Sequence, residues 1–229
     1  NTQQEFISAY GQIHNKRYHY LHWQNHNKPR IIFIHGALAN AYWYAFIAPF
    51  FTDNFDIISI SLPGHGKSDW QESYHADDFL NIIAKHSKTD TQNILIGHSL
   101  GAKLCLHYLQ EQHVNISHTI LLDPPIGTPF FHNKKRPTQH HQIYPDADIL
   151  AQRFRIIPRQ PMDNSYICAY VAKNSICAES NGYRWQFDPN FFNKLHIGKY
   201  TDYAATANLK TQMHLIYGVH SSITTENVR

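Results

Sequence analysis

A serine between two glycines is the strongest chemical signal in the sequence. It is Ser99, which follows a short apolar run at 94–96 and opens a helical pattern over 99–112. The residues around it read Gly97-His98-Ser99-Leu100-Gly101. Glycines two positions before and after a serine permit a sharp, tightly packed turn, and the amino end of a helix favours negative charge there. This spacing predicts a nucleophile elbow, with Ser99 attacking an acyl carbon.

A second group of candidate residues follows another apolar run, at 31–34. The chain there reads His35-Gly36-Ala37, and Trp43 lies six residues further on. Together with the serine motif, this stretch resembles the α/β-hydrolase superfamily, whose members place an HG turn at this point. The resemblance implies an oxyanion hole formed by the backbone N–H groups of Ala37 and Leu100, each contributing about 3–4 kcal/mol in the transition state. The supporting residues would be His35, Gly36, Gly97, His98 and Gly101.

A third motif, Leu62-Pro63-Gly64-His65-Gly66-Lys67-Ser68, resembles the P-G-H-G-x-S turn of the same superfamily. This turn buttresses the site there and does not react. Ser61 precedes the motif, at a position where an aspartate often stands. The motifs occur in the order found in the superfamily, and the resemblance runs from about residue 5 to residue 225.

The acid of the expected catalytic triad is missing from its usual place. The superfamily supplies it after the seventh strand in a G-x-x-D setting, where this chain has Gly218-Val219-His220-Ser221. A serine there cannot orient an imidazole with negative charge. Some members take the acid from the end of the sixth strand, which here points to Asp123, before Pro124 and Pro125. The alternative role of Asp123 is to order that proline turn.

The resemblance places the general base on a loop after an eighth strand. The sequence ends at Arg229, inside the helix expected after the seventh strand, so we expect the catalytic histidine beyond Arg229. The last strand and helix of the fold would then also be missing from a sequence that begins with Asn1 and not with methionine. The alternative base within the chain is His220, at the tip of the seventh strand.

Short apolar runs alternate with helical patterns from Arg30 onward, and these elements must position the motifs. The runs are continuously apolar, which is typical of parallel strands buried on both faces. They lie at 31–34, 57–60, 94–96, 120–122 and 214–217, with helical patterns at 75–86 and 99–112. The alternation predicts an α/β fold with a doubly wound, mostly parallel sheet. Residues 5–24 instead resemble an opening antiparallel hairpin around Gly11.

About ninety residues separate the runs that end near Leu122 and Leu215, far more than a crossover needs. The segment is rich in aromatic residues, and we expect two helices in it, at 147–157 and 163–178. We interpret it as a helical lid inserted after the sixth strand, the alternative being additional core. The lid would comprise 125–204, and the hydrolase core 1–124 and 205–229. Trp43 of the core and Trp185 of the lid are the candidate pocket residues.

Composition argues against several other classes of protein. The formal net charge of +3 is too small for a nucleic-acid-binding surface, and 18 consecutive apolar residues, the signal of a membrane span, do not occur. The 3 cysteines form no CxxC pair, and their odd number fits a reducing compartment, so we expect a cytoplasmic protein. We expect neither a cofactor nor a metal ion, and the sequence does not indicate the oligomeric state.

These features together predict a serine hydrolase that cleaves a small-molecule carboxylic ester through an acyl-enzyme on Ser99. The first alternative is carbon–carbon bond hydrolysis or acyl transfer on the same scaffold, because a fold alone does not choose a reaction. The second is a hydrolase-like protein that binds small molecules without catalysis. Ser221 and the missing histidine favour the binding protein, whereas Ser99, its glycines and the HG turn favour an enzyme.

Overall fold

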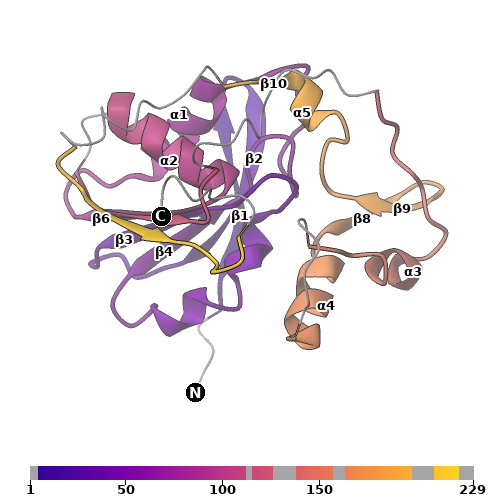
Figure 1. Ribbon diagram of the computed structural model, residues 1–229, viewed down its shortest axis with the longest axis horizontal. Coiled ribbons are helices and arrows are strands. Elements are labelled where there is room, and N and C mark those ends of the chain that lie inside the picture. Colours follow the sequence, from indigo (N-terminus) through magenta and orange to yellow (C-terminus); the bar gives the residue numbers. More distant parts are fainter. Residues whose placement is uncertain (1–4, 112–114, 126–137, 157–162, 198–208, 222–229) are drawn as a thin grey trace.

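A seven-stranded sheet forms the centre of the computed structural model (Figure 1). The structure describes residues 5–111, 115–125, 138–156, 163–197 and 209–221. The strands, in spatial order, are β1 (Ile7–Ile13), β2 (Lys16–Trp23), β4 (Asp56–Ile60), β3 (Arg30–Ile34), β6 (Asn93–His98), β7 (Ile116–Leu122) and β11 (Gln212–Ile216). β2 pairs antiparallel with β1 and β4, and the other neighbours are parallel. The predicted α/β fold with a mostly parallel sheet is confirmed.

Burial on both faces explains why the central strands read as continuous apolar runs. All five residues of β4 are buried, as are four of the five in β3. On one face, Leu95 and Leu121 belong to a core that includes residues of helices α1 (Ala76–His86) and α2 (Leu100–Glu111). On the other face, Phe33 packs with residues of the short 3-10 helix η1 (Ala41–Tyr44), which η2 (Ala48–Phe50) follows.

The helices of the core agree closely with the periodic patterns in the sequence. α1 differs from the predicted range by one residue at its start and α2 by one residue at each end. Figure 1 shows both helices on the same side of the sheet. Asp77 and Asp78 lie in the first turn of α1, where their carboxylates interact favourably with the partial positive charge of the helix end.

Among the described residues, no helix combines the length and the apolar character that crossing a membrane requires.

The amino-terminal hairpin turns at a different place from the one that the sequence suggests. His14 and Asn15 both have positive φ, 46° and 62°, which is the backbone of a tight two-residue turn between twisted strands. Gly11, the residue expected at the turn, lies within β1. A Cβ atom there would lie 2.3 Å from the ring of Tyr18, so this glycine leaves room for a buried aromatic side chain.

Between β7 and β11 the chain leaves the sheet and forms an inserted unit, defined here as residues 138–156 and 163–186. It contains α3 (Ala147–Ala151), α4 (Ser165–Lys173), β8 (Ile176–Glu179) and β9 (Gly182–Trp185). Figure 1 shows these elements beside the sheet. The helices expected at 147–157 and 163–178 are both shorter in the structure. α3 ends at Ala151 and α4 at Lys173, and the hairpin of β8 and β9 follows α4 where the second helix was predicted to continue.

Residues 187–197 return the chain to the core, although the sequence pattern assigns them to the lid. α5 (Phe191–Lys194) buries Phe191 completely in the core that α1 and α2 share. The short strand β10 (Leu195–His196) then pairs in parallel with β5 (Tyr74–His75). The aromatic side chains of this segment therefore fill the core, which composition alone does not distinguish from a pocket lining.

A buried carboxylate organises the amino-terminal ends of the central strands. Asp56 is fully buried and pairs with Arg30 at 2.5 Å, Lys88 at 2.8 Å and His22 at 2.7 Å. Burial raises the pKa of this carboxyl, but hydrogen bonds from His22, Lys88 and Arg30 outweigh it and hold the pKa well below the usual range. These ends lie opposite the carboxyl-terminal edge of the sheet, where the candidate catalytic residues stand.

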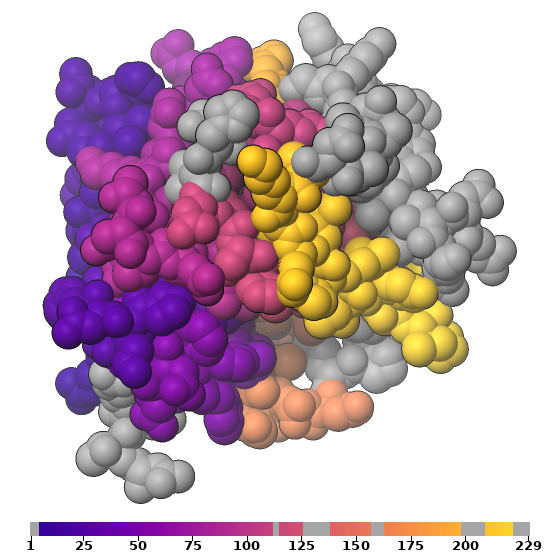
Figure 2. Space-filling view, turned by 90° about the vertical axis from the view of Figure 1, so that its left-hand side faces the viewer, coloured from indigo at the N-terminus to yellow at the C-terminus, as the bar shows by residue number. Residues whose placement is uncertain are grey.

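β11 lies at one edge of the sheet and pairs with β7 alone among the described strands. All five of its residues are exposed, and Figure 2 shows this part of the chain, in yellow, on the molecular surface. Its pairing brings the carboxyl end of β11 beside that of β7, where Asp123 follows.

Candidate active site

Ser99 occupies a sharp turn between β6, which ends at His98, and α2, which begins at Leu100. Its φ of +49° lies in the left-handed region, which a non-glycine residue adopts at a cost of about 1–2 kcal/mol. Two backbone hydrogen bonds hold it there: its N–H donates to the carbonyl of Leu122 at 2.9 Å, and its carbonyl accepts from Lys103 at 3.2 Å. The predicted strand–turn–helix setting of Ser99 is therefore present.

The glycines of the two motifs are required because backbone segments approach one another closely. A Cβ atom on Gly97 would lie 2.5 Å from the Gly101 carbonyl oxygen, and one on Gly101 would lie 2.1 Å from the Ile34 carbonyl oxygen. A Cβ atom on Gly36 would lie 2.7 Å from His98 Nδ1 and 3.3 Å from the Ser99 Cβ. These contacts press the end of β3 against the serine turn.

The two backbone N–H groups expected to bind an oxyanion belong to the residues that directly follow Ser99 and Gly36, which lie in contact. Leu100 is the first residue of α2, so its N–H has no acceptor within the helix. Ala37 follows Gly36, which packs against Ser99. The turn that carries Ala37 is closed by a hydrogen bond from the Ala39 N–H to the Gly36 carbonyl at 3.2 Å, and Leu38 has a φ of +65°.

His35 is a structural residue of this turn, because both of its ring nitrogens are occupied. Nδ1 donates to the Gly36 carbonyl at 2.7 Å, and Nε2 accepts from the Leu62 N–H at 2.9 Å, which fixes the neutral tautomer. Burial, together with the neighbouring His65, holds the pKa of His35 well below its usual value. His35 therefore joins the HG turn to the P-G-H-G turn, and its imidazole is not available to accept a proton from Ser99.

Asp123 stands directly after β7, beside the serine turn. Its φ is +45°, and its N–H donates to the Ile216 carbonyl of β11 at 2.7 Å. The strand register pairs His98 with Leu122, so Ser99 and Asp123 each follow one member of a paired position. Burial lowers the pKa of His98, and the charge of Asp123 partly opposes that shift, which is an electrostatic sign of their proximity.

The alternative base, His220, and Ser221, which stands where the acid is usually found, lie in the turn after β11. His220 is exposed in the turn after β11, and the Ser221 N–H donates to the Gly218 carbonyl at 2.9 Å. Within the described residues, no histidine forms a hydrogen bond with the Ser99 hydroxyl. The catalytic histidine expected beyond Arg229 lies outside the described residues.

Ser61, at the position where an aspartate often stands, supports the start of η1. Its Oγ accepts a hydrogen bond from the Ala41 N–H at 3.1 Å and lies 3.0 Å from His19 Nδ1. His19 is fully buried, and burial together with the charge of Lys67 lowers its pKa to about 4. The uncharged Ser61 hydroxyl therefore lies beside an uncharged imidazole. The same hydroxyl binds the first residue of η1, the helix that follows the HG turn.

Two buried polar residues that the sequence motifs do not identify make long-range contacts: Asn40 joins the core to the inserted unit, and Asp188 ties the returning segment 187–197 to the core. Asn40 is buried and donates from its side chain to Asn174 and Ser175 of the inserted unit. Asp188 is buried, accepts from the Tyr74 hydroxyl at 2.8 Å and from Lys194 at 2.7 Å, and donates its N–H to Gly64. The contacts of Asn40 with Asn174 and of Asp188 with Tyr74 span more than a hundred residues, so no local sequence pattern predicts them.

The two candidate pocket residues are linked by a third aromatic ring. Phe154 lies 6.1 Å from Trp43 and 6.1 Å from Trp185, measured between ring centroids. Trp43 follows the HG turn, whereas Phe154 and Trp185 belong to the inserted unit. The three rings therefore bridge the unit and the core, in contacts typical of aromatic packing.

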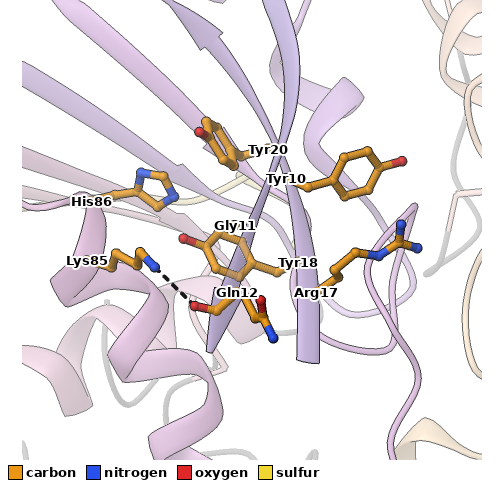
Figure 3. A pocket seen from close by; sticks show the side chains of 8 residues that line it. All are labelled: Tyr10, Gly11, Gln12, Arg17, Tyr18, Tyr20, Lys85 and His86. Carbon is orange, nitrogen blue, oxygen red and sulfur yellow. Dashed lines mark hydrogen bonds between the residues drawn. The ribbon is translucent and has the colours of Figure 1, made fainter. Parts of the chain in front are cut away.

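A hollow of about 530 Å³ lies elsewhere, between the β1–β2 hairpin and the end of α1 (Figure 3). Its lining includes Tyr18, Tyr20 and His86, with Lys85 donating to the Gln12 carbonyl at 3.0 Å. None of the predicted site residues lines it. Among the described residues, no three histidine, cysteine or acidic side chains are grouped closely enough to hold a metal ion.

Comparison with known proteins gives matches over most of the chain. Residues 29–194 match a family described as alpha/beta hydrolase fold. An uncharacterised hydrolase, YugF, from Bacillus subtilis is 28% identical over 109 residues, covering 45% of this chain and 40% of the relative. The 2-(acetamidomethylene)succinate hydrolase of Mesorhizobium japonicum is 36% identical over 78 residues, covering 33% of this chain and 28% of the relative. The chain thus spans well under half the length of these two curated relatives.

Among solved structures, the thioesterase domain from the curacin biosynthetic pathway superposes with a TM-score of 0.79 at 21% identity. The superposition covers 97% of this chain and 86% of that domain. At this level of identity the likeness concerns the fold, and it extends over the inserted unit as well as the sheet.

Proposed function

The chain belongs to the α/β-hydrolase fold family, and from that premise we propose that it hydrolyses a small-molecule carboxylic ester with Ser99 as the nucleophile. The observation that carries the proposal is the backbone of Ser99. A serine held at a φ of +49° between a buried strand and a helix, among close-packed glycines, occupies a backbone region that costs a non-glycine residue about 1–2 kcal/mol. Such strain is typical of a site that serves chemistry.

In the proposed reaction, the Ser99 hydroxyl attacks the ester carbonyl and forms a tetrahedral oxyanion. The N–H groups of Ala37 and Leu100 donate to that oxyanion, and the alcohol leaves as the acyl-enzyme forms. Water then attacks the acyl group and regenerates Ser99. Asp123 orients the imidazole that removes the serine proton and stabilises its positive charge. The inserted unit acts as the lid, with Trp43 and Trp185 against the substrate.

A second candidate is hydrolysis of another acyl substrate at the same serine. The relative from Mesorhizobium japonicum is named for its action on 2-(acetamidomethylene)succinate, and its matching segment is 36% identical to this chain. In this reading Ser99, Ala37 and Leu100 keep their roles, and the pocket selects a different leaving group. A panel of esters, thioesters and substituted succinates compared at equal concentration separates the two candidates.

A fluorophosphonate probe tests the nucleophile directly, because it forms a covalent bond with an activated serine. We expect labelling of the protein and of a Ser8→Ala variant, and none of a Ser99→Ala variant. Ser8 is a demanding control, since its hydroxyl lies 3.0 Å from His19 Nε2 but has no strand–turn–helix setting. Labelling that persists in the Ser99→Ala variant, or an absence of labelling in the unmodified protein, would overturn the proposal.

A further inference from the structure

One buried side chain ties the HG turn to the inserted unit. Asn40 is 2% exposed, and its Oδ1 accepts from the Tyr42 N–H at 3.0 Å. Its Nδ2 donates to the Asn174 carbonyl at 3.1 Å and to the Ser175 hydroxyl at 3.0 Å. One amide thus fixes the start of η1 on one side and the end of α4 on the other.

The core side of this contact is the turn that carries Ala37. The turn begins at Gly36, passes through Leu38 at a φ of +65°, and ends at Asn40, which caps η1. β3 holds its first end through the sheet, and the Asn40 side chain holds its last end. A left-handed residue within the turn means that these outer contacts must maintain its shape.

The other side of the contact is the carboxyl end of α4, where helix carbonyls lack partners within the helix. Asn40 donates to one of them, that of Asn174, which is the C-cap residue. Ser175 accepts from Asn40 and donates to the Val171 carbonyl at 2.8 Å, so its hydroxyl is fixed as well. A residue of the core therefore caps a helix of the inserted unit.

A third segment packs against Asn40. A Cβ atom on Gly66, whose φ is +55°, would lie 2.9 Å from the Asn40 Cβ. The glycine lets the P-G-H-G turn pack directly on this side chain. The amide can satisfy Tyr42, Asn174 and Ser175 together only while the inserted unit is docked.

We infer that Asn40 is a positioning residue, which makes the placement of the Ala37 N–H depend on docking of the inserted unit. The inference rests on the proposed function, because it takes Ala37 as an oxyanion donor. With α4 docked, Asn40 is held by three partners and the turn keeps its shape. Without that contact, the turn loses its anchor and the donor moves away from the oxyanion.

Four single variants test this coupling through ester turnover. Asn40→Ala removes the whole contact, whereas Ser175→Ala removes one of its two hydrogen bonds to the inserted unit and leaves the one to the Asn174 carbonyl. Asn93→Ala is the control for Asn40, since Asn93 is equally buried and bonds to backbone at Lys88 and Asn115, at the other end of the sheet. Ser87→Ala is the control for Ser175, since Ser87 also donates to a carbonyl four residues earlier and accepts from a side chain.

We expect kcat to fall about 10²-fold in Asn40→Ala and about tenfold in Ser175→Ala, with KM changed by less than about threefold, because a misplaced donor weakens the transition state alone. The double variant should be no slower than Asn40→Ala, since both remove one interaction. Affinity for a trifluoromethyl ketone, which forms a tetrahedral oxyanion on serine, should fall in parallel with kcat. Both controls should keep kcat and inhibitor affinity within about twofold.

Equal kcat in Asn40→Ala and Asn93→Ala would overturn the inference and leave the proposed function intact. A normal kcat in Ser175→Ala would also overturn it, because the inference requires that losing one of the two hydrogen bonds from Asn40 to the inserted unit disturbs the turn. This variant decides the matter if Asn40→Ala does not fold. Failure of the proposed function is a different result: the unmodified protein would neither turn over esters nor react with fluorophosphonate at Ser99.

Discussion

The backbone N–H of Ser99 donates a hydrogen bond to the carbonyl oxygen of Leu122 at 2.9 Å. This bond continues the β6–β7 ladder one residue past its last pair, His98 and Leu122. Asp123 follows Leu122, so the proposed nucleophile and acid directly follow the ends of neighbouring strands, which lie about 4.8 Å apart in a sheet. Their spacing is thus set by the sheet and not by a flexible loop.

Replacing the proposed nucleophile should remove activity and keep the fold. We expect Ser99→Ala to lower kcat for a short-chain p-nitrophenyl ester by up to about a millionfold, as is typical when a triad loses its nucleophile. The melting temperature should stay within a few degrees, because the hydroxyl is not part of the core packing. Ester turnover and thermal unfolding measured on the same preparation check both halves; an unchanged turnover rate would contradict the assignment of Ser99.

A substitution at Asp123 distinguishes its two possible roles, the acid of the catalytic triad and a residue that only orders the turn. Asp123→Asn keeps the size of the side chain and should lower kcat by up to about 10⁴-fold, because a neutral amide favours the wrong imidazole tautomer. If Asp123 only orders the proline turn, the variant should lose stability and keep kcat. Comparing kcat with the urea midpoint distinguishes the two roles, and near-normal turnover would mean that the acid lies elsewhere.

Gly101 should tolerate no side chain. A Cβ atom there would lie 2.1 Å from the Ile34 carbonyl oxygen, so Gly101→Ala must push β3 away from α2. We expect a loss of about 3 kcal/mol or more in the free energy of unfolding, the upper range for overpacking. Gly218→Ala is the matched control, since its nearest contact would be 3.8 Å away. Chemical denaturation measures both, and equal stability of the two variants would refute the close approach.

Stability should fall below neutral pH because buried histidines resist protonation. Burial lowers the pKa of His19 and His65 to about 4 and that of His86 to about 3, from 6.5. Between pH 6.5 and these values the unfolded chain binds more protons, so stability rises with pH and is lost as pH falls. Each group contributes a slope of about 1.4 kcal/mol per pH unit in that window.

His86→Phe tests this slope at a single site. The ring of His86 packs beside Tyr18 and Tyr20 (Figure 3), so phenylalanine keeps the aromatic contacts and removes the titrating group. We expect the slope of unfolding free energy between pH 4.5 and 6 to flatten by about 1.4 kcal/mol per pH unit. Tyr20→Phe, which alters the same cluster but keeps the imidazole, should retain the full slope. If His86→Phe shows the same slope as the unmodified protein, then His86 binds protons equally in the folded and unfolded states, which would contradict the prediction.

Sequence patterns predict the parts of this protein that short segments determine. Apolar runs marked the parallel strands, and the glycine spacing around Ser99 marked the turn, because each depends on a few consecutive residues. The hairpin at 176–185 was missed, since its residues resemble a helical continuation of α4. The contacts of Asn40 and Asp188 could not be foreseen, because their partners lie more than a hundred positions away. Aromatic density likewise did not separate Phe191, a core residue, from the rings near Trp43.

The left-handed backbone at Ser99 favours a residue other than the one that the proposed chemistry needs. A glycine at this position would relieve the strain of a φ of +49°, which offsets or exceeds its own entropic cost in the folded state. Ser99→Gly should therefore be at least as stable as the natural protein and fully inactive. In a population selected only for folded, soluble protein, glycine would accumulate at position 99 while Gly101 stayed fixed. The residue that suits the fold best at position 99 and the residue that the proposed chemistry needs are therefore different.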